Sequence, residues 1–287
     1  MKKTFAIIMA LSAAVAASAQ VQPQENVQET TVYPGQTVRA FSHRGGRLER
    51  DENTAYAFQK SWEAGFTGFE TDIRMTKDGV LYLTHDSTLE RTTNGTGVFE
   101  EKTSAEIEKL LTKKGNKMMK FDDFCKWLDG KENLYVEFEM KSLPKELYPE
   151  DRLVEYVEKI YKKVSKIKTK NSHFVFTSSD YRGLRYMQQH HPEMDLLLIC
   201  SKPICDETIA LAKTTGIMTL GCTTEGTSRE AVKKAKKEGI CVSLWPSKSV
   251  DDFVRAVMLG ADRLCIDVPL DVKRFMEEKM PWVKVVW

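Results

Sequence analysis

Short apolar runs alternate with longer amphipathic segments along the chain, after a polar stretch at residues 20–36. The runs are rich in Val, Ile, Leu and Phe and do not alternate strictly between apolar and polar residues. This pattern is typical of parallel strands that are buried on both faces. It predicts strands at residues 39–42, 68–73, 80–84, 134–139, 174–177, 196–199, 218–220, 240–244 and 263–266.

Amphipathic segments between these runs predict helices. Asn53 or Thr54 can cap a helix that Gly65 ends. Thr103 and Glu106 have the spacing of a capping box, which predicts the start of another helix. Strands that alternate with helices indicate a parallel α/β fold.

One connection between predicted strands is too short for a helical crossover, which takes a dozen residues or more. It is the six-residue segment 74–79, and it ends in the turn signal Asp78-Gly79. Residues 80–84 are therefore expected to fold back antiparallel as a hairpin arm, which leaves eight parallel strands. The pattern predicts a (β/α)₈ TIM barrel, with a small inserted lobe at about residues 87–124 after the hairpin arm.

The N-terminal residues have the pattern of a secretory signal peptide. Lys2 and Lys3 precede an apolar run at 5–17, which is too short and too rich in Ala and Ser for a membrane span. Small residues at 17–19 form a cleavage site before Gln20. We therefore expect a signal at 1–19, a polar segment at 20–37, a barrel domain at 38–287, and an exported protein, periplasmic or secreted, without a stable membrane anchor.

The charge balance excludes a general binder of polyanions. Without Lys2 and Lys3, the 43 basic residues fall to 41, equal to the 41 acidic residues. A neutral chain is not expected to bind nucleic acid or an anionic membrane. The oligomeric state does not follow from the sequence.

The six cysteines do not have the pattern of a disulfide framework, since there is no CxxC and several lie in apolar runs. Buried free thiols are expected, because Cys packs as a small hydrophobic residue. Cys200 and Cys205 are close enough in sequence for pairing to stay open.

Acidic residues mark the ends of two predicted strands. Glu70 and Asp72 are two residues apart, so both side chains point to one face of their strand, which is the interior of a closed barrel. Glu139, or Glu137 on the same strand face, adds a third carboxylate. Three carboxylates without a thiolate favour one divalent cation, Mg²⁺ or Ca²⁺. A set of salt bridges without a metal is the alternative.

Two histidines lie near the same strand ends. His43 and His85 are candidates for a proton donor and a proton acceptor, because imidazole titrates near neutral pH. The other three have positions that suit structural roles: His173 opens a strand at the far end of the barrel, and His190 and His191 lie late in a helix.

The ordered motifs resemble the glycerophosphodiester phosphodiesterase family. They are His43-Arg44-Gly45, Glu52-Asn53-Thr54, Glu70-x-Asp72, Thr76-x-Asp78-Gly79, His85-Asp86, Thr92-Thr93-Asn94-Gly95-x-Gly97, Glu139-x-Lys141, Trp245 and Asp267-x-Pro269. The resemblance covers nearly the whole chain beyond the signal and implies a TIM barrel with an insertion. It also implies that Glu70, Asp72 and Glu139 hold the metal, with Glu139 selected over Glu137 by its spacing to Lys141, and that His43 and His85 transfer protons.

Other roles follow from the chemistry of the side chains. Arg44 has a fork that suits two phosphate oxygens, and Lys141 supplies a point charge for the same phosphate. Glu52 is expected to orient Arg44 or the metal ligands. Trp245 is expected either to wall the pocket or to lie in the core.

The resemblance implies metal-dependent hydrolysis of a small glycerophosphodiester to glycerol phosphate and an alcohol. A substrate hydroxyl would attack the phosphorus, and water would then open the cyclic phosphate. Two alternatives stay open: a lysophospholipid or other phosphodiester as substrate of the same site, and an exported binding protein without turnover. The alcohol head group and the choice between Mg²⁺ and Ca²⁺ are not set by the sequence.

Overall fold

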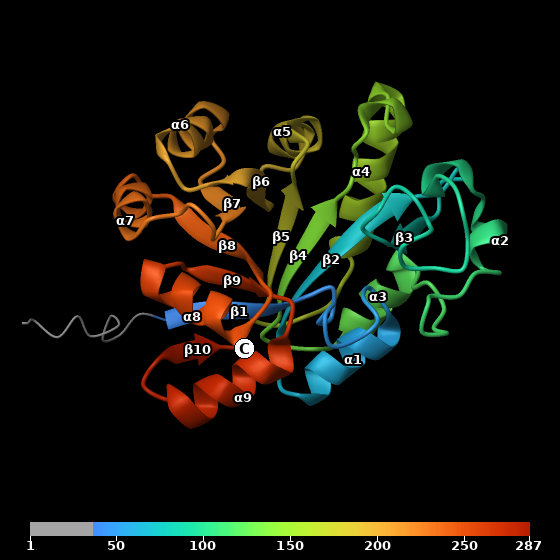
Figure 1. Ribbon diagram of the computed structural model, residues 1–287. Helices are drawn as coiled ribbons and strands as arrows, with labels where there is room; N and C mark the ends of the chain where they lie inside the picture. Colours follow the sequence, from blue (N-terminus) through green and yellow to red (C-terminus); the bar gives the residue numbers. More distant parts are fainter. Residues whose placement is uncertain (1–36) are drawn as a thin grey trace, which may run out of the picture.

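Eight parallel strands close into a barrel in the computed structural model, which describes residues 37–287 (Figure 1). The ring runs β1-β2-β4-β5-β6-β7-β8-β9 and closes because β1 pairs with both β9 and β2. The strands are β1 (Thr37–His43), β2 (Gly68–Met75), β3 (Leu81–Leu83), β4 (Tyr135–Met140), β5 (His173–Ser178), β6 (Asp195–Pro203), β7 (Thr219–Thr223), β8 (Cys241–Ser247), β9 (Arg263–Ile266) and β10 (Lys284–Val286). The predicted TIM barrel is confirmed.

Helices surround the ring of strands, as Figure 1 shows. They are α1 (Ala55–Glu63), α2 (Ser104–Ile107), α3 (Phe121–Leu128), α4 (Glu150–Val164), α5 (Tyr181–His190), α6 (Asp206–Thr215), α7 (Arg229–Lys237), α8 (Val250–Leu259) and α9 (Pro269–Lys279). The capping box of Thr103 and Glu106 is present at α2. At α1 the Thr54 hydroxyl accepts the Ala57 N–H, so Thr54 caps this helix.

The predicted hairpin arm is confirmed. β3 pairs antiparallel with β2, with Ile73 opposite Leu83. Thr76 and Asp78 hydrogen-bond within the turn, and Gly79 has a φ of 81°, which favours a residue without a side chain.

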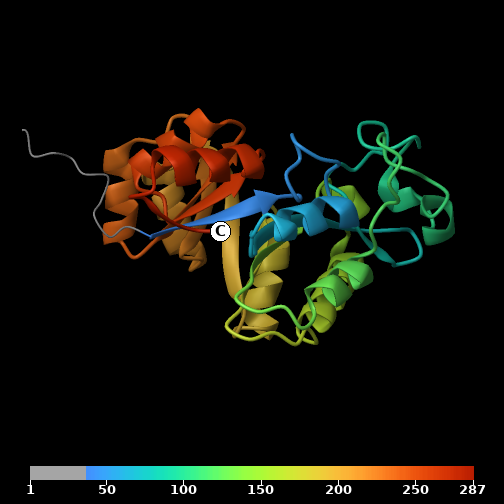
Figure 2. The same ribbon diagram turned by 90° about the horizontal axis from the view of Figure 1, so that it is seen from below.

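The chain between β3 and α3 forms a separate lobe beside the barrel. Its buried residues Leu89, Phe99 and Ile107 form a small hydrophobic cluster with Tyr82 of β3. In Figure 2 this teal-to-green lobe lies on the opposite side of the molecule from the orange helices. The lobe therefore stands next to the end of the hairpin arm, where the predicted site residue His85 follows β3.

A tenth strand was not predicted. β10 pairs parallel with the start of β1, where Thr37 lies opposite Lys284. The six cysteines, all within the described residues, are free, and Cys205 and Cys241 are only half-buried.

The part of the chain that the structure describes contains no helix long and apolar enough to cross a membrane. The predicted signal at 1–19 and most of the polar segment at 20–37 lie outside the described residues.

Candidate active site

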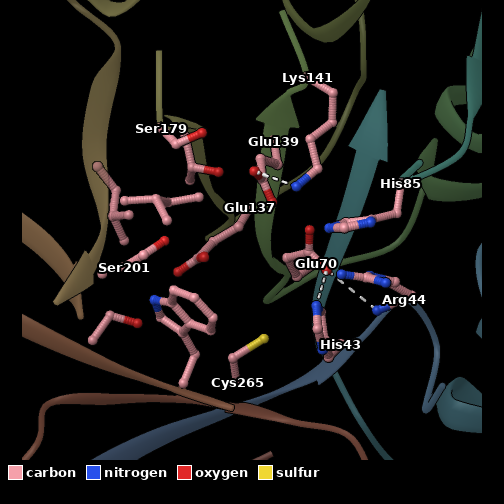
Figure 3. Close-up of a pocket in the computed structure, with 16 residues that line it drawn as sticks. His43, Arg44, Glu70, His85, Glu137, Glu139, Lys141, Ser179, Ser201 and Cys265 are labelled. Carbon is pink, nitrogen blue, oxygen red and sulfur yellow. Dashed lines mark hydrogen bonds and ion pairs between the residues drawn. The ribbon is translucent and has the colours of Figure 1, made fainter. Parts of the chain in front are cut away.

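A cavity of about 190 Å³ opens at the carboxyl ends of the barrel strands (Figure 3). Its walls include His43 at the end of β1, Glu70 on β2, and Glu139 near the end of β4. This end of a TIM barrel is where catalytic groups collect, because side chains from several strands converge there.

Three predicted carboxylates come together in this cavity. Ligand atoms of Glu70, Asp72 and Glu139 all lie within 4.8 Å of one another, and the three residues are buried. They meet because β2 and β4 pair in register, with Asp72 opposite Glu139. Glu137 belongs to no such group among the described residues, since its carboxylate accepts the Tyr135 hydroxyl deeper in the barrel. Burial raises the pKa of Glu137 to about 7.

Two cations partly balance these acids. Lys141 Nζ lies 2.6 Å from Glu139 Oε1 and 3.3 Å from Asp72 Oδ1, and Arg44 Nε lies 2.9 Å from Asp72 Oδ2. Burial opposes ionisation of Asp72, but the charges of Arg44 and Lys141 outweigh it and hold the Asp72 pKa well below its usual value. Asp72 is therefore ionised, and its pairs form without any metal.

Glu70 is not balanced in this way. Burial, and then the neighbouring charge of Asp72, raise the pKa of Glu70 well above its usual value. Its Oε1 atom is buried and has no hydrogen-bond partner among the described residues. A buried carboxylate oxygen without a partner is costly, and a bound cation removes this cost. The cluster therefore fits a divalent ion that prefers oxygen ligands.

The His43 imidazole is hydrogen-bonded through the ring nitrogen that faces away from the cavity. Its Nδ1 hydrogen-bonds to Asp267, which lies just after β9 and also pairs with Arg47 at 2.8 Å. Its Nε2 points into the cavity, 3.6 Å from Glu70 Oε2 (Figure 3). Burial, and then the charge of Arg44, lower the pKa of His43 to about 4, so the imidazole is neutral near pH 7.

His85 lies at the outer edge of the same cavity, directly after the hairpin arm. Its Nδ1 lies 2.6 Å from Asp86 Oδ1, and its side chain is 34% exposed, against 11% for His43. Asp86 forms an ion pair with Arg91. The guanidinium of Arg91 also donates two hydrogen bonds of 2.8 Å to the Glu52 carboxylate. Contacts with residues of the lobe thus position both His85 and Glu52.

The turn after β1 positions Arg44. This residue has a φ of 54°, an uncommon value for a residue with a side chain, and its N–H donates to the Glu70 backbone oxygen at 3.0 Å. Its guanidinium donates to Glu52 at 3.0 Å. The prediction that Glu52 orients Arg44 agrees with this contact. A Cβ at Gly45 would come within 2.6 Å of the Ala57 Cβ, so only glycine fits beside α1.

Asn53 does not cap α1, which corrects the expectation that it shares this role with Thr54. Its Nδ2 donates to Asp72 Oδ2 at 2.9 Å, and its Oδ1 accepts the Thr71 hydroxyl at 2.9 Å. It therefore fixes one oxygen of the carboxylate cluster. The side chain points into the barrel mouth because Asn53 has a φ of 56°, a conformation that Asn adopts more easily than most residues.

Trp245 lines the cavity and is half-buried. Its Nε1 is buried without a hydrogen-bond partner among residues 37–287. It packs against the small cluster that contains Phe41, Tyr135 and Cys265. Trp245 therefore lies in the wall of the pocket and also packs against the core, the two positions that were expected as alternatives.

Three site residues had no functional role in the sequence interpretation: Asp267, Asp86 and Arg91. Asp267 and Asp86 belong to recognisable motifs, but periodicity cannot show that they contact histidines. Arg91 carries no motif signal, and only the folded lobe brings it to Glu52.

The fold is a TIM barrel, and histidines, carboxylates and cations meet at the carboxyl ends of its strands, where the enzymes of this fold have their active sites. Residues 43–271 match the Glycerophosphoryl diester phosphodiesterase family, and this chain belongs to that family. The predicted family and enzyme class are thereby confirmed.

Individual relatives agree with this family. The chain is 29% identical to a glycerophosphodiester phosphodiesterase from Caldanaerobacter subterraneus subsp. tengcongensis, over 80% of this chain and 93% of the relative. A phosphodiesterase from Oleispira antarctica, solved in complex with the product sn-glycerol-3-phosphate, is 17% identical with a TM-score of 0.72, over 84% of this chain and 97% of that one. A glycerophosphodiester phosphodiesterase from Thermotoga maritima is 18% identical with a TM-score of 0.63, over 84% of this chain and 97% of that one. At these identities the two structures show a shared fold.

Proposed function

We propose that this protein hydrolyses small glycerophosphodiesters to glycerol phosphate and an alcohol, with a divalent cation and two histidines. One observation carries the proposal: in a chain of this family, two histidines, each held by an aspartate, line a cavity together with Glu70 and Glu139, and Asp72 lies directly beside these two carboxylates. The cavity volume of about 190 Å³ suits a small polar substrate.

Glu70, Asp72 and Glu139 would hold Mg²⁺ or Ca²⁺, which when bound would draw charge from the phosphoryl oxygens. Arg44 and Lys141 supply fixed positive charge beside the same cluster. Both are held by acids before the substrate arrives, so they need little reorganisation as charge develops on the phosphate.

The two histidines have different surroundings, which suggests different roles. His43 lies deeper, and its Nδ1 faces Asp267, so Nε2 is left to accept a proton from a substrate hydroxyl. His85 is more exposed, at the side where an alcohol can leave toward solvent. In this proposal His43 removes the proton from the attacking glycerol hydroxyl and His85 protonates the leaving alkoxide, which leaves a cyclic glycerol phosphate. Water then opens the cyclic phosphate to give glycerol phosphate.

The test is a release assay on glycerophosphocholine, glycerophosphoethanolamine and a lysophospholipid, each with and without a chelator. We expect glycerol phosphate from the first two, loss of activity with the chelator, and recovery with added Mg²⁺ or Ca²⁺. Turnover of the lysophospholipid alone would support the alternative substrate. Binding without turnover of any of the three would indicate the exported binding protein.

The proton transfers are tested by His43→Ala and His85→Ala. Each variant is expected to lose about 10²–10⁴-fold in kcat, the usual contribution of a general acid or base. His191→Ala is the control, because His191 pairs with Glu158 between α4 and α5. The double variant should lose much less than the product of the two single losses, since the residues act together. Independent losses would assign one histidine to binding alone.

We also propose that the protein is exported, on the basis of the basic residues, apolar run and small residues within 1–19. Expression of the full chain in a Gram-negative host and N-terminal sequencing of the periplasmic fraction test this. A mature protein that begins at Gln20 is expected. Recovery of an uncleaved chain from the cytoplasm would contradict the proposal.

A further inference from the structure

A second group of possible metal ligands shares this cavity. Ligand atoms of His43, Glu70 and Cys265 lie within 4.8 Å of one another, and all three residues are buried. They come from β1, β2 and β9, which are neighbours because β1 pairs with both other strands. Figure 3 shows the Cys265 sulfur on the cavity side of its strand, toward His43 and Glu70.

Two of these side chains are already arranged as ligands. His43 Nδ1 is bound to Asp267, which leaves Nε2 facing Glu70. A metal-binding histidine usually has its second ring nitrogen held by a carboxylate in this way. Glu70 is only 4% exposed, and its Oε1 has no hydrogen-bond partner among residues 37–287. Glu70 therefore places one oxygen, Oε2, 3.6 Å from His43 Nε2 and has a second, buried oxygen free to bind a cation.

We propose that His43, Glu70 and Cys265 form a site for Zn²⁺ or a similar thiophilic divalent cation, distinct from the three-carboxylate cluster. Nitrogen, sulfur and carboxylate oxygen are the ligands of zinc, and three protein ligands leave a fourth position for water. Binding forms a metal–sulfur bond as the Cys265 thiol releases its proton to the solvent. The all-oxygen group of Glu70, Asp72 and Glu139 has the opposite preference, for Mg²⁺ or Ca²⁺.

The two sites share Glu70, so their ions compete. A thiophilic ion would also occupy His43 Nε2, the nitrogen that accepts a proton in the proposed reaction. Zinc is therefore an inhibitor that added Mg²⁺ or Ca²⁺ relieves. This consequence rests on the proposed function, whereas binding of the ion does not.

Cobalt(II) titration of the purified apoprotein tests the binding site directly, because cobalt bound to a thiolate has a sulfur-to-metal charge-transfer absorption in the near ultraviolet. We expect the absorption in the unaltered protein and its loss in Cys265→Ser and Cys265→Ala. Zinc affinity, measured by displacement of cobalt, should fall by more than the roughly 10–100-fold typical for loss of a residue that only orients a ligand. Circular dichroism of each variant confirms that it is folded.

Two matched variants separate this site from its neighbours. Glu139→Gln removes a ligand of the carboxylate cluster and should keep the cobalt absorption. Cys222→Ser removes a buried thiol on β7. Cys222 faces outward, because its neighbour in the strand, Gly221, lines the cavity. The Cys222→Ser variant should therefore also keep the absorption. An absorption that survives both Cys265 variants, or disappears in Cys222→Ser, would overturn the proposal.

The inhibition is measured with glycerophosphocholine in the presence of Mg²⁺. Zinc should inhibit the unaltered enzyme, and Cys265→Ser should need at least about tenfold more zinc for the same fractional inhibition. Equal sensitivity of the two proteins would contradict the inhibitory role. A protein that shows the cobalt absorption but no turnover would keep the metal site and reject the proposed function.

Discussion

Asp267 has two basic partners and no exposed surface. It accepts from His43 Nδ1 and pairs with Arg47, while its own side chain is fully buried. A buried carboxylate in this position keeps one tautomer of the imidazole and fixes the direction of its ring. Asp267 is therefore a positioning residue that acts through His43.

Asp267→Asn is expected to lower kcat by about 10²–10⁴-fold, close to the loss in His43→Ala, because the amide cannot hold the imidazole in the same tautomer. KM should change little, since Asp267 does not line the cavity. The limb of the pH–rate profile that depends on the ionisation of His43 should shift. Substitution of a purely structural residue would not cause this shift. The measurement is steady-state kinetics over a range of pH.

Asp195→Asn is the control for this variant. Asp195 also pairs with a histidine, His173, but this pair lies at the start of β5 and β6, at the far end of the barrel. Equal losses in the two variants would show that His–Asp pairs support the fold in general, and would remove the special role of Asp267.

At the scale of elements, the sequence was sufficient for the eight barrel strands and the hairpin arm, although not for β10. Buried parallel strands produce continuous apolar runs, and a six-residue connection can only join antiparallel strands. The approach of Asp267 to His43 was beyond such reasoning. It depends on the pairing of Ser42 with Ile266, which closes the barrel between residues 224 positions apart in the chain.

The role of Asn53 was missed for a related reason. An Asn before a helix has the composition of a cap, and its contact with Asp72 exists only once β2 and the turn after β1 are packed together. Likewise, strand periodicity alone left Glu137 and Glu139 equivalent, and only the resemblance to the family selected Glu139. The register places Glu137 opposite Glu70 and Glu139 opposite Asp72, but among the described residues only Glu139 joins the group of ligand atoms, while Glu137 accepts the Tyr135 hydroxyl.

Asp78 is one of the residues that join the hairpin arm to the lobe. Asp78 accepts from the Thr76 hydroxyl at 2.7 Å, and from the Ser104 N–H at 2.8 Å and hydroxyl at 2.7 Å. These hydrogen bonds, first that of Thr76 and then that of Ser104, lower the pKa of Asp78 to about 2. The charged form is thus the one that stabilises the connection between hairpin and lobe.

Asp78→Ala should lower Tm by a few degrees at pH 6, since a domain of this size loses roughly 2–4 °C for each kcal/mol. The unfolded carboxyl titrates near 4 and the folded one near 2, so its contribution is complete above pH 4 and is lost as the pH falls toward 2. The Tm difference between the two proteins should therefore shrink between pH 4 and pH 2. Asp123→Ala, at an exposed position of α3, is the control. A difference that is constant with pH would contradict a role for the charge.

At the scale of the whole molecule, the barrel mouth collects acids from strands far apart in sequence. Glu70 and Glu139 face the cavity and Asp72 lies beside them. Arg44 pairs with Asp72, and Lys141 pairs with Asp72 and Glu139. Like charges that are buried together oppose folding, so this end of the barrel is expected to be less stable than it would be without its site. A bound cation reverses that effect and couples the stability of the fold to the ion.

Glu70→Gln separates these two effects. Without divalent ions the variant should melt at a higher temperature than the unaltered protein, because a charge next to Asp72 and Glu139 is removed. An ion at 100 times its Kd should stabilise the unaltered protein by about 2.7 kcal/mol, or roughly 5–10 °C, and the variant much less. Calorimetry with chelator and with Mg²⁺ or Ca²⁺ measures both shifts. Equal stabilisation of the two proteins by the ion would place the cation elsewhere, and a lower melting temperature of the ion-free variant would show that Glu70 supports the fold by itself.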